Sequence, residues 1–272
     1  MSKNLTRRKE RGISILEGGE GDPFLFLHGI PGSSFTWSTI GELLANHYRV
    51  ILPDLPGFGQ SDLPGEDYYL EAQAWAIKRT LDGLGIRELY LGGHDFGGPV
   101  VLTLIRLFPE LSVKGLVLSS TNVFTDSYIP PALRMARVPL VITLFFKMMV
   151  GNRVGKRVMF QLATVEKREA SWEDFKRHLT PSAIDLTRRI FQRSLANLRS
   201  NYQAVENSLA YLAVPTLVLW GTGDPFFGPS VGQRTHQAIQ GSVLKLYEHT
   251  VHFVPEEKPY LVAQDILSLF KG

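Results

Sequence analysis

The chain has 272 residues, of which 44% are hydrophobic, so it can bury the core of one large domain and overall disorder is excluded. Its 29 basic and 26 acidic residues leave a net charge of +3, which is too balanced for a dedicated nucleic-acid-binding protein. The sequence contains no cysteine, which excludes disulfides, thiolate metal sites and cysteine catalysis.

The N-terminal residues Met1 to Arg11 carry the positive charge of a signal peptide, but no apolar segment follows them. We therefore expect a cytoplasmic protein. The longest apolar run, Val138 to Val150, has 13 residues and contains Lys147, whereas crossing a bilayer takes about 20. This run is expected to form a cap or core helix.

Short apolar runs bounded by Gly, Pro and Asp alternate with helical patterns, which is typical of a mostly parallel sheet covered on both faces. Between Tyr69 and Leu84, for example, apolar residues recur at spacings of three and four, as they do on one face of a helix. The predicted strands are Ile13–Leu16, Phe24–Leu27, Arg49–Leu52, Leu89–Leu91, Lys114–Leu118, Thr216–Trp220 and Val243–Tyr247.

The alternation of strands and helices breaks after Ser120, and residues of helical character fill the chain until the strand at Thr216. We interpret this as an insertion into one core domain. The core is predicted to comprise residues 1–121 and 207–272, and a helical cap to comprise residues 122–206.

Between Ser127 and Ser200 the chain has 14 Lys or Arg residues against 5 Asp or Glu residues. One interpretation is a solvated basic surface. The alternative is attraction of an anionic substrate or a weak contact with a membrane surface, because Val138 to Met159 mixes apolar and basic residues.

Residues 89–98 read LYLGGHDFGG, an apolar strand that runs into a Gly-x-Asp-x-Gly turn and then a helix at Pro99–Leu107. A tight strand-to-helix turn needs glycines beside its central residue, because that residue is strained and its neighbours pack closely. Asp95 is therefore expected at the carboxyl end of a central strand. Alone, the pattern also fits an aspartate that only caps a helix.

Two upstream segments change this interpretation. Residues 24–33 form a strand followed by His28-Gly29-Ile30-Pro31, and residues 54–61 read DLPGFGQS. With the turn at Asp95, these segments resemble the α/β-hydrolase superfamily in the same order along the chain. The resemblance implies an α/β-hydrolase fold in which His28, Gly29 and Pro31 belong to the oxyanion loop.

An acid and a histidine should follow the nucleophile in that fold. Asp224 comes directly after the predicted strand Thr216–Trp220, where the family has its acid, and His252 begins a segment similar to the family's histidine loop. His249 is a rival candidate, but only His252 is followed by the matching Phe and Glu-x-Pro. Val251 departs from the family, which usually has glycine there.

An aspartate in place of the more common serine has a chemical consequence. A carboxylate is ionised at neutral pH and can attack saturated carbon directly, which predicts an alkyl ester on Asp95. His252, oriented by Asp224, would activate water to hydrolyse that ester, and the backbone N–H groups of Ile30 and Phe96 would hold the oxyanion. Epoxide hydrolases and haloalkane or fluoroacetate dehalogenases share this chemistry.

The residues around Asp95 favour epoxide hydrolysis. Haloalkane dehalogenases usually place Trp after the nucleophile and Asn or Trp as a second halide donor, whereas Phe96 and Ile30 have no side-chain N–H. Fluoroacetate dehalogenases have an Arg beside the nucleophile. Residues 33–37 (SSFTW) do resemble the dehalogenase loop, so carbon–halogen hydrolysis remains the alternative.

Epoxide hydrolases usually hydrogen-bond the ring oxygen with two lid tyrosines. Residues 200–204 (SNYQA) are similar to the segment that bears the second one, which makes Tyr202 the candidate proton donor; its other interpretation is a packing residue. Tyr128 or His178 is a candidate for the first donor. Apolar residues are expected to line the substrate pocket: Phe145, Phe146, Met148, Met149, Phe160 and Phe227.

The sequence thus predicts a hydrolase that needs no cofactor or metal and converts an apolar epoxide to a diol through an ester on Asp95. Its expected partners are a small apolar substrate and water. A third hypothesis is a hydrolase-fold protein that binds a ligand without turning it over.

Overall fold

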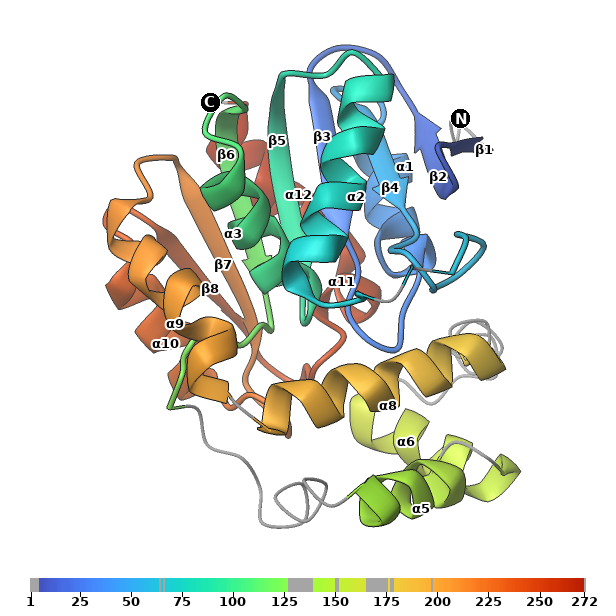
Figure 1. The fold of residues 1–272 in the computed structure, drawn as a ribbon. Coiled ribbons are helices and arrows are strands. Elements are labelled where there is room, and N and C mark those ends of the chain that lie inside the picture. The colour runs from blue at the N-terminus through green and yellow to red at the C-terminus, as the bar shows by residue number, and fades with distance from the viewer. Residues whose placement is uncertain are drawn as a thin grey trace.

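One eight-stranded sheet organises the chain in the computed structural model, which describes residues 5–63, 65, 67–126, 139–149, 152–164, 176, 179–196 and 198–271 (Figure 1). The strands are β1 (Thr6–Glu10), β2 (Ile13–Gly18), β3 (Pro23–Leu27), β4 (Arg49–Pro53), β5 (Glu88–His94), β6 (Ser112–Ser119), β7 (Thr216–Gly221) and β8 (Val243–Tyr247). Their order in the sheet is β1-β2-β4-β3-β5-β6-β7-β8.

All strands from β3 to β8 pair in parallel, and only β1 and β2 run antiparallel to their neighbours. The predicted mostly parallel α/β sheet is therefore present. Sequence reasoning missed β1, whose residues Thr-Arg-Arg-Lys-Glu are nearly all charged. Charged side chains are typical of an exposed edge strand, because they discourage further strand pairing.

Helices cover both faces of the sheet and bury two separate apolar layers. On one face α1 (Ser38–Leu44) and α12 (Pro259–Phe270) pack over residues such as Phe24 and Leu219. On the other face α2 (Leu70–Gly83), α3 (Gly97–Leu107) and α10 (Pro229–Ala238) pack over residues such as Leu25 and Leu118. Because the strands from β3 to β8 run parallel, the carboxyl ends of β3, β5, β7 and β8 lie at one edge of the sheet.

Four described α-helices intervene between β6 and β7: α5 (Pro139–Met149), α6 (Arg153–Ala163), α8 (Pro181–Ala196) and α9 (Leu198–Ser208). We call them the inserted helices. α9 packs on α3, and α8 connects it to α5 (Figure 1). The precise limits of the cap at residues 122 and 206 remain a prediction. No helix in the described ranges has both the length and the apolar character to cross a membrane.

A polar cluster joins the two ends of the insertion. The backbone N–H and the hydroxyl of Thr125 donate to one carboxylate oxygen of Glu206, at 2.9 and 2.6 Å. Arg234 of α10 bridges Glu206 and Asp126, and its guanidinium lies over the ring of Phe124. The chain leaving β6 is thereby tied to the end of α9 and to the core.

Candidate active site

A strained turn presents Asp95 at the end of β5. Asp95 has a φ of 50°, which is in the left-handed region and is unfavourable for residues other than glycine. A Cβ on Gly93 would lie 2.6 Å from the backbone of Gly97, and one on Gly97 would lie 2.5 Å from the carbonyl oxygen of Leu27. The two glycines are needed because strand, turn and helix approach this closely, as the sequence pattern predicts.

Hydrogen bonds fix the backbone of this turn. The Asp95 N–H donates to the carbonyl of Ser119 at 3.1 Å, and the Asp95 carbonyl accepts from the N–H of Gly98 and the hydroxyl of Thr121. The last bond is 2.6 Å long. The neighbouring strand β6 and the start of α3 therefore support the strained conformation together.

The two carboxylate oxygens of Asp95 have different surroundings. Oδ1 accepts a hydrogen bond of 2.8 Å from the backbone N–H of Ile30, whereas Oδ2 lies 3.7 Å from Nε2 of His252. Phe96 follows Asp95 at the N-terminal end of α3, where backbone N–H groups have no partner within the helix. The predicted donor Ile30 thus contacts the carboxylate, and the contribution of the Phe96 N–H remains a prediction.

The oxyanion loop is held by buried polar groups. Nε2 of His28 accepts from the N–H of Leu55 at 2.9 Å, so Nδ1 carries the proton and donates to the Gly29 carbonyl. Pro31 follows Ile30 in the same loop, and a Cβ on Gly29 would lie 2.4 Å from the Cβ of Asp95. His28 is fully buried, and its bonds give it a role in shaping the loop rather than in acid–base chemistry.

Asp54 fixes the far side of this loop. Its buried carboxylate accepts from the backbone N–H groups of Ser34 and Gln60 at 2.6 and 2.9 Å. It also pairs with Arg7 of β1 at 2.9 Å. The unpredicted edge strand therefore contributes a charge that stabilises the segment following the oxyanion loop.

His252 and Asp224 come together beside Asp95 as the sequence pattern predicts. Nδ1 of His252 lies 3.0 Å from Oδ2 of Asp224, while Oδ1 of Asp224 accepts from the N–H groups of Phe226 and Phe227 at 2.9 and 3.0 Å. This bonding leaves Nε2 of His252 directed at Asp95. The rival His249 is exposed.

The three groups form a buried chain of alternating charge. Burial lowers the pKa of His252, but the carboxylates of Asp224 and Asp95 outweigh it and raise the pKa to about 10. Burial raises the pKa values of Asp95 and Asp224, and the imidazolium outweighs it and brings both below the ordinary value. The resting state consequently holds two carboxylates around one cation.

A second buried histidine supports the first. Nε2 of His94 lies 3.0 Å from the carbonyl of His252, and burial lowers the pKa of His94 to about 4. His94 is therefore neutral at physiological pH and donates its proton to that carbonyl. Its bond fixes the backbone of the histidine loop.

Aromatic side chains surround the imidazole of His252. The rings of Phe226 and Phe227 lie 4.9 and 5.7 Å from it, and Phe253 lies 5.4 Å away. Phe226 and Phe253 also pack in one apolar cluster with Phe160 of α6. The inserted helices therefore cover the loops that carry Asp224 and His252 with apolar surface.

The structure places the predicted pocket residues differently. Met148 is 61% exposed on α5, so its prediction as a pocket residue is wrong. Phe227 lies beside His252, and Phe146 of α5 packs against the cluster around Phe160. The side chains of Phe145 and Met149 lie outside the part of the chain that the structure describes.

Tyr202 of α9 is buried, and its hydroxyl interacts with those of Tyr69 and Ser194 and with the charge of Asp95. The hydroxyls of Tyr69 and Ser194 are 2.7 Å apart. Burial is the main reason that the pKa of Tyr202 lies well above its ordinary value, so this phenol keeps its proton. Tyr202 is thus part of a buried hydroxyl cluster that is near enough to Asp95 to interact electrostatically with its carboxylate.

Sequence reasoning missed Tyr69, which directly precedes α2 and belongs to the core. Its ring lies 6.0 Å from that of Phe96, and the guanidinium of Arg193 stacks over it at 4.7 Å. An aromatic residue at the start of an amphipathic helix indicates only packing, so the sequence carried no specific signal for it. The other candidates, Tyr128 and His178, lie outside the described residues.

Two buried indole N–H groups are already engaged. Trp37 donates to the carbonyl of Leu27 at 3.0 Å, and Trp220 donates to the carbonyl of Phe227 at 2.6 Å. Neither is directed at the space beside Asp95. Although residues 33–37 resemble a dehalogenase loop, the Trp37 N–H is thus bonded to a backbone carbonyl and does not point toward a halide site beside Asp95.

Comparison with known proteins identifies the family of this chain. The model of a family described as the alpha/beta hydrolase fold matches residues 22–259. The chain belongs to this family. This hydrolase-fold protein is 27% identical to haloalkane dehalogenase 2 of Mycobacterium tuberculosis over 275 residues. The aligned region covers 95% of the present chain and 91% of the dehalogenase. Epoxide hydrolase 4 of Mus musculus is 25% identical over 288 residues, covering 94% and 76%.

Esterases are also structurally similar to this hydrolase-fold protein. The solved structure of a thermophilic esterase from Thermogutta terrifontis superposes with a TM-score of 0.80 at 25% identity, covering 98% of this chain and 97% of the esterase. The relatives thus share the hydrolase fold while differing in the reaction that their names state. The residues around Asp95 are therefore the basis for distinguishing among those reactions.

Proposed function

We propose that this protein hydrolyses an apolar epoxide to a diol through a covalent ester on Asp95, without a cofactor. The observation that carries the proposal is the asymmetry of the Asp95 carboxylate. One oxygen accepts from the Ile30 N–H, and the other lies 3.7 Å from Nε2 of His252, while the carboxylate also interacts electrostatically with the buried hydroxyl of Tyr202. A serine-type hydrolase has no such pair of oxygens.

In the first step, Oδ2 of Asp95 attacks a carbon of the epoxide ring and the ring C–O bond breaks. Tyr202 donates its proton to the departing ring oxygen, and Tyr69 and Ser194 hold its hydroxyl in place. The products are a hydroxyalkyl ester on Asp95 and a phenolate on Tyr202. Oδ1 becomes the ester carbonyl oxygen, already bonded to the Ile30 N–H.

Ester formation changes the charge that His252 experiences. In the resting state the Asp95 carboxylate helps to keep His252 protonated, and the neutral ester removes that support. The imidazolium then loses its proton, which neutralises the Tyr202 phenolate. Neutral His252 is thereby produced only when an ester is present to be hydrolysed.

In the second step, His252 takes a proton from water, and the hydroxide attacks the carbonyl carbon of the ester. Ile30 and Phe96 stabilise the resulting oxyanion on Oδ1 through their backbone N–H groups. Collapse of this intermediate breaks the bond between Cγ and Oδ2 of Asp95, so the alkoxide leaves with Oδ2 and takes the proton of the newly formed carboxyl group. The diol leaves while Asp95 is again ionised and His252 is again protonated.

Epoxide opening fits the surroundings better than carbon–halogen hydrolysis. Ring opening needs a proton donor near the carboxylate, and the cluster of Tyr202, Tyr69 and Ser194 supplies hydroxyls there. Halide departure needs N–H donors instead, and the buried indoles of Trp37 and Trp220 are bonded to carbonyls.

The proposal can be tested by measuring the intact mass of a His252→Gln variant after incubation with apolar epoxides or with haloalkanes. Without the base, the ester should accumulate, so we expect a mass increase equal to one whole epoxide, located on Asp95. The control is the double variant Asp95→Asn/His252→Gln, which keeps the pocket but lacks the nucleophile and should remain unmodified.

Two other outcomes would overturn the proposal. An alkyl adduct from haloalkanes with release of halide, and none from epoxides, would make the protein a dehalogenase. Binding of epoxides without any adduct or turnover would favour the hypothesis of a ligand-binding protein.

A further inference from the structure

α5 presents a line of exposed apolar side chains. Leu140, Leu144 and Met148 follow one another at spacings of four, so they lie on one face of the helix. Their side chains are 77%, 57% and 61% exposed. Single exposed apolar residues are ordinary on protein surfaces, but three in a row on one helix form a patch.

α6 extends this patch. Val154 and Val158 are also four residues apart and are 74% and 39% exposed. α5 and α6 contact each other, and they lie at the end of the molecule farthest from the sheet (Figure 1). We call the surface made by Leu140, Leu144, Met148, Val154 and Val158 the α5–α6 surface.

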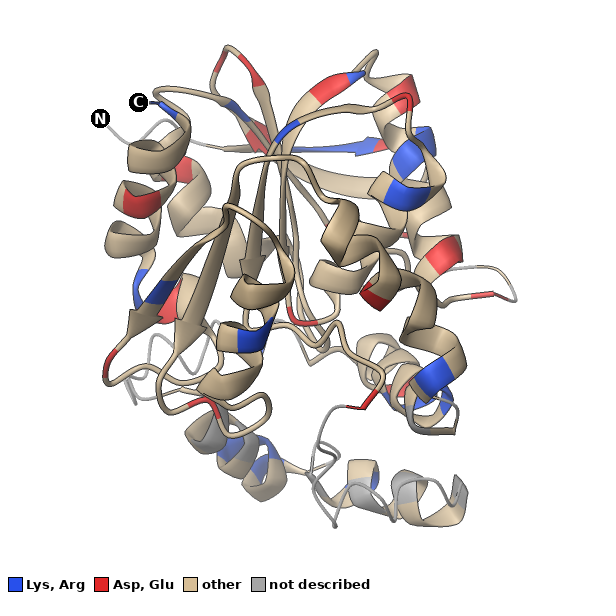
Figure 2. Ribbon diagram, turned by 90° about the vertical axis from the view of Figure 1, so that its left-hand side faces the viewer, with Lys and Arg blue, Asp and Glu red and all other residues tan. Residues whose placement is uncertain are grey.

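The charges beside this surface have one sign. Residues 139–164 include Lys147, Arg153, Lys156 and Arg157 but no Asp or Glu. Figure 2 accordingly shows blue bands and no red bands on the two lowest helices. An apolar face flanked only by basic side chains is the arrangement with which a helix lies on an anionic membrane surface.

We propose that the α5–α6 surface docks on an anionic lipid bilayer, with its apolar side chains entering the boundary of the acyl chains and Lys147 and Arg153 meeting the phosphates. Both helices have 11 residues, which is too short to span a bilayer and suits a position in the plane of the interface. A second copy of this chain is disfavoured as the occupant, because a symmetric contact would bring like charges together. The inference does not depend on the proposed reaction.

Docking here would bring the lipid close to the catalytic loops. On the opposite side from the exposed valines, α6 buries Phe160 in the apolar cluster with Phe226 and Phe253. These two phenylalanines contact the ring of His252. One layer of inserted helices therefore separates the proposed membrane-facing surface from His252.

The test is flotation of the full-length protein with vesicles of phosphatidylcholine, with and without phosphatidylserine. We expect binding to the vesicles that contain phosphatidylserine, weakening as salt is added. The variant Leu144→Glu/Met148→Glu should bind at least about tenfold more weakly, because each change places a carboxylate on the surface that enters the lipid. The variant Lys147→Gln/Arg153→Gln should weaken binding by a similar factor, through loss of attraction to the headgroups.

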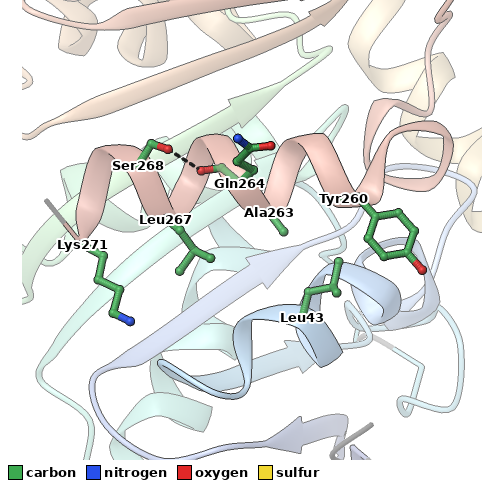
Figure 3. A pocket seen from close by; sticks show the side chains of 7 residues that line it. All are labelled: Leu43, Tyr260, Ala263, Gln264, Leu267, Ser268 and Lys271. Atoms are coloured by element: carbon green, nitrogen blue, oxygen red, sulfur yellow. Dashed lines mark hydrogen bonds between the residues drawn. The ribbon is translucent and has the colours of Figure 1, made fainter. Parts of the chain in front are cut away.

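A matched control is available on α12. Tyr260 and Leu261 are exposed apolar residues, and Tyr260 lines a groove between α1 and α12 (Figure 3). The variant Tyr260→Glu/Leu261→Glu should bind vesicles as the wild type does. All variants should retain the wild-type thermal unfolding transition, since the changed side chains are exposed.

Three results would refute the proposal. They are failure of the wild type to float with vesicles containing phosphatidylserine, equal binding by the wild type and the two variants of the α5–α6 surface, and equal weakening of binding by the α12 control. Light scattering supplies a further check. If the wild type forms a dimer and the two variants of the α5–α6 surface do not, a second copy of the chain covers that surface instead of a membrane.

Discussion

The charge coupling between Asp95 and His252 can be tested by replacing Asp95 with Asn, which is neutral like the proposed ester. Two unit charges 3.7 Å apart interact by about 4 kcal/mol at an effective dielectric constant of about 20, equivalent to a change of about 3 in pKa. The pKa of His252 should therefore fall from about 10 in the wild type to about 7 in Asp95→Asn. The assay is a pH titration of the imidazole signals by NMR after isotopic labelling of histidine.

The seven histidines require an assignment, which the signal missing from His252→Gln provides. Asp224→Asn is the matched control, because it removes the other carboxylate, 3.0 Å from the same ring, and should lower the pKa of His252 at least as much. A pKa of His252 that is equal in the wild type and in Asp95→Asn would refute the reasoning. Ester formation on Asp95 would then not lower the pKa of His252, and His252 would not become a neutral base.

The remaining predictions concern the hydroxyl cluster, the oxyanion loop and pH. Tyr202→Phe should slow ester formation from an epoxide by about 10²-fold or more and Tyr69→Phe by about tenfold, both without slowing ester hydrolysis in single-turnover measurements. Gly29→Ala should reduce the rate of adduct formation by more than about 10²-fold, because its Cβ would lie 2.4 Å from that of Asp95. The circular dichroism spectrum should remain that of the wild type. Loss of folded structure in proportion to the loss of rate would contradict this prediction. The raised pKa of His252 stabilises the fold below about 6.5, its unfolded value, and this contribution is lost as pH rises through about 10. In denaturant unfolding, the free energy of unfolding of His252→Gln should therefore fall less than that of the wild type as the pH rises through about 10.

The sheet and the edge that carries the candidate site could be predicted because their signals are local. A buried parallel strand is a short apolar run, and the turn at Asp95 requires glycines at fixed positions, so both are visible in the sequence. Asp224 and His252 follow their strands at the same edge, and the chain order of the fold identifies them. The structure brings the three together: Nδ1 of His252 lies 3.0 Å from Oδ2 of Asp224, and Nε2 lies 3.7 Å from Oδ2 of Asp95.

Residues that depend on distant contacts could not be predicted. The charged sequence of β1 indicates neither burial nor a strand, yet Arg7 reaches Asp54, 47 residues away. Tyr69 likewise acquires its place in the hydroxyl cluster only when Ser194 packs against it from 125 residues along the chain. Hydrogen bonds of this kind leave no periodic pattern in the sequence, because they depend on how the inserted helices sit over the core.

The arrangement of charge offers a physical reason for keeping a carboxylate at position 95. A buried carboxylate is costly unless a cation compensates it, and His252 supplies that cation while itself lying between two anions. The same cation could not serve as a base in the resting state. In the proposed reaction, esterification of Asp95 would remove one of the anions and so lower the pKa of His252 when a base is needed. Asp224 remains ionised throughout, and its two bonds to the backbone N–H groups of Phe226 and Phe227 keep the imidazole aligned while its charge changes.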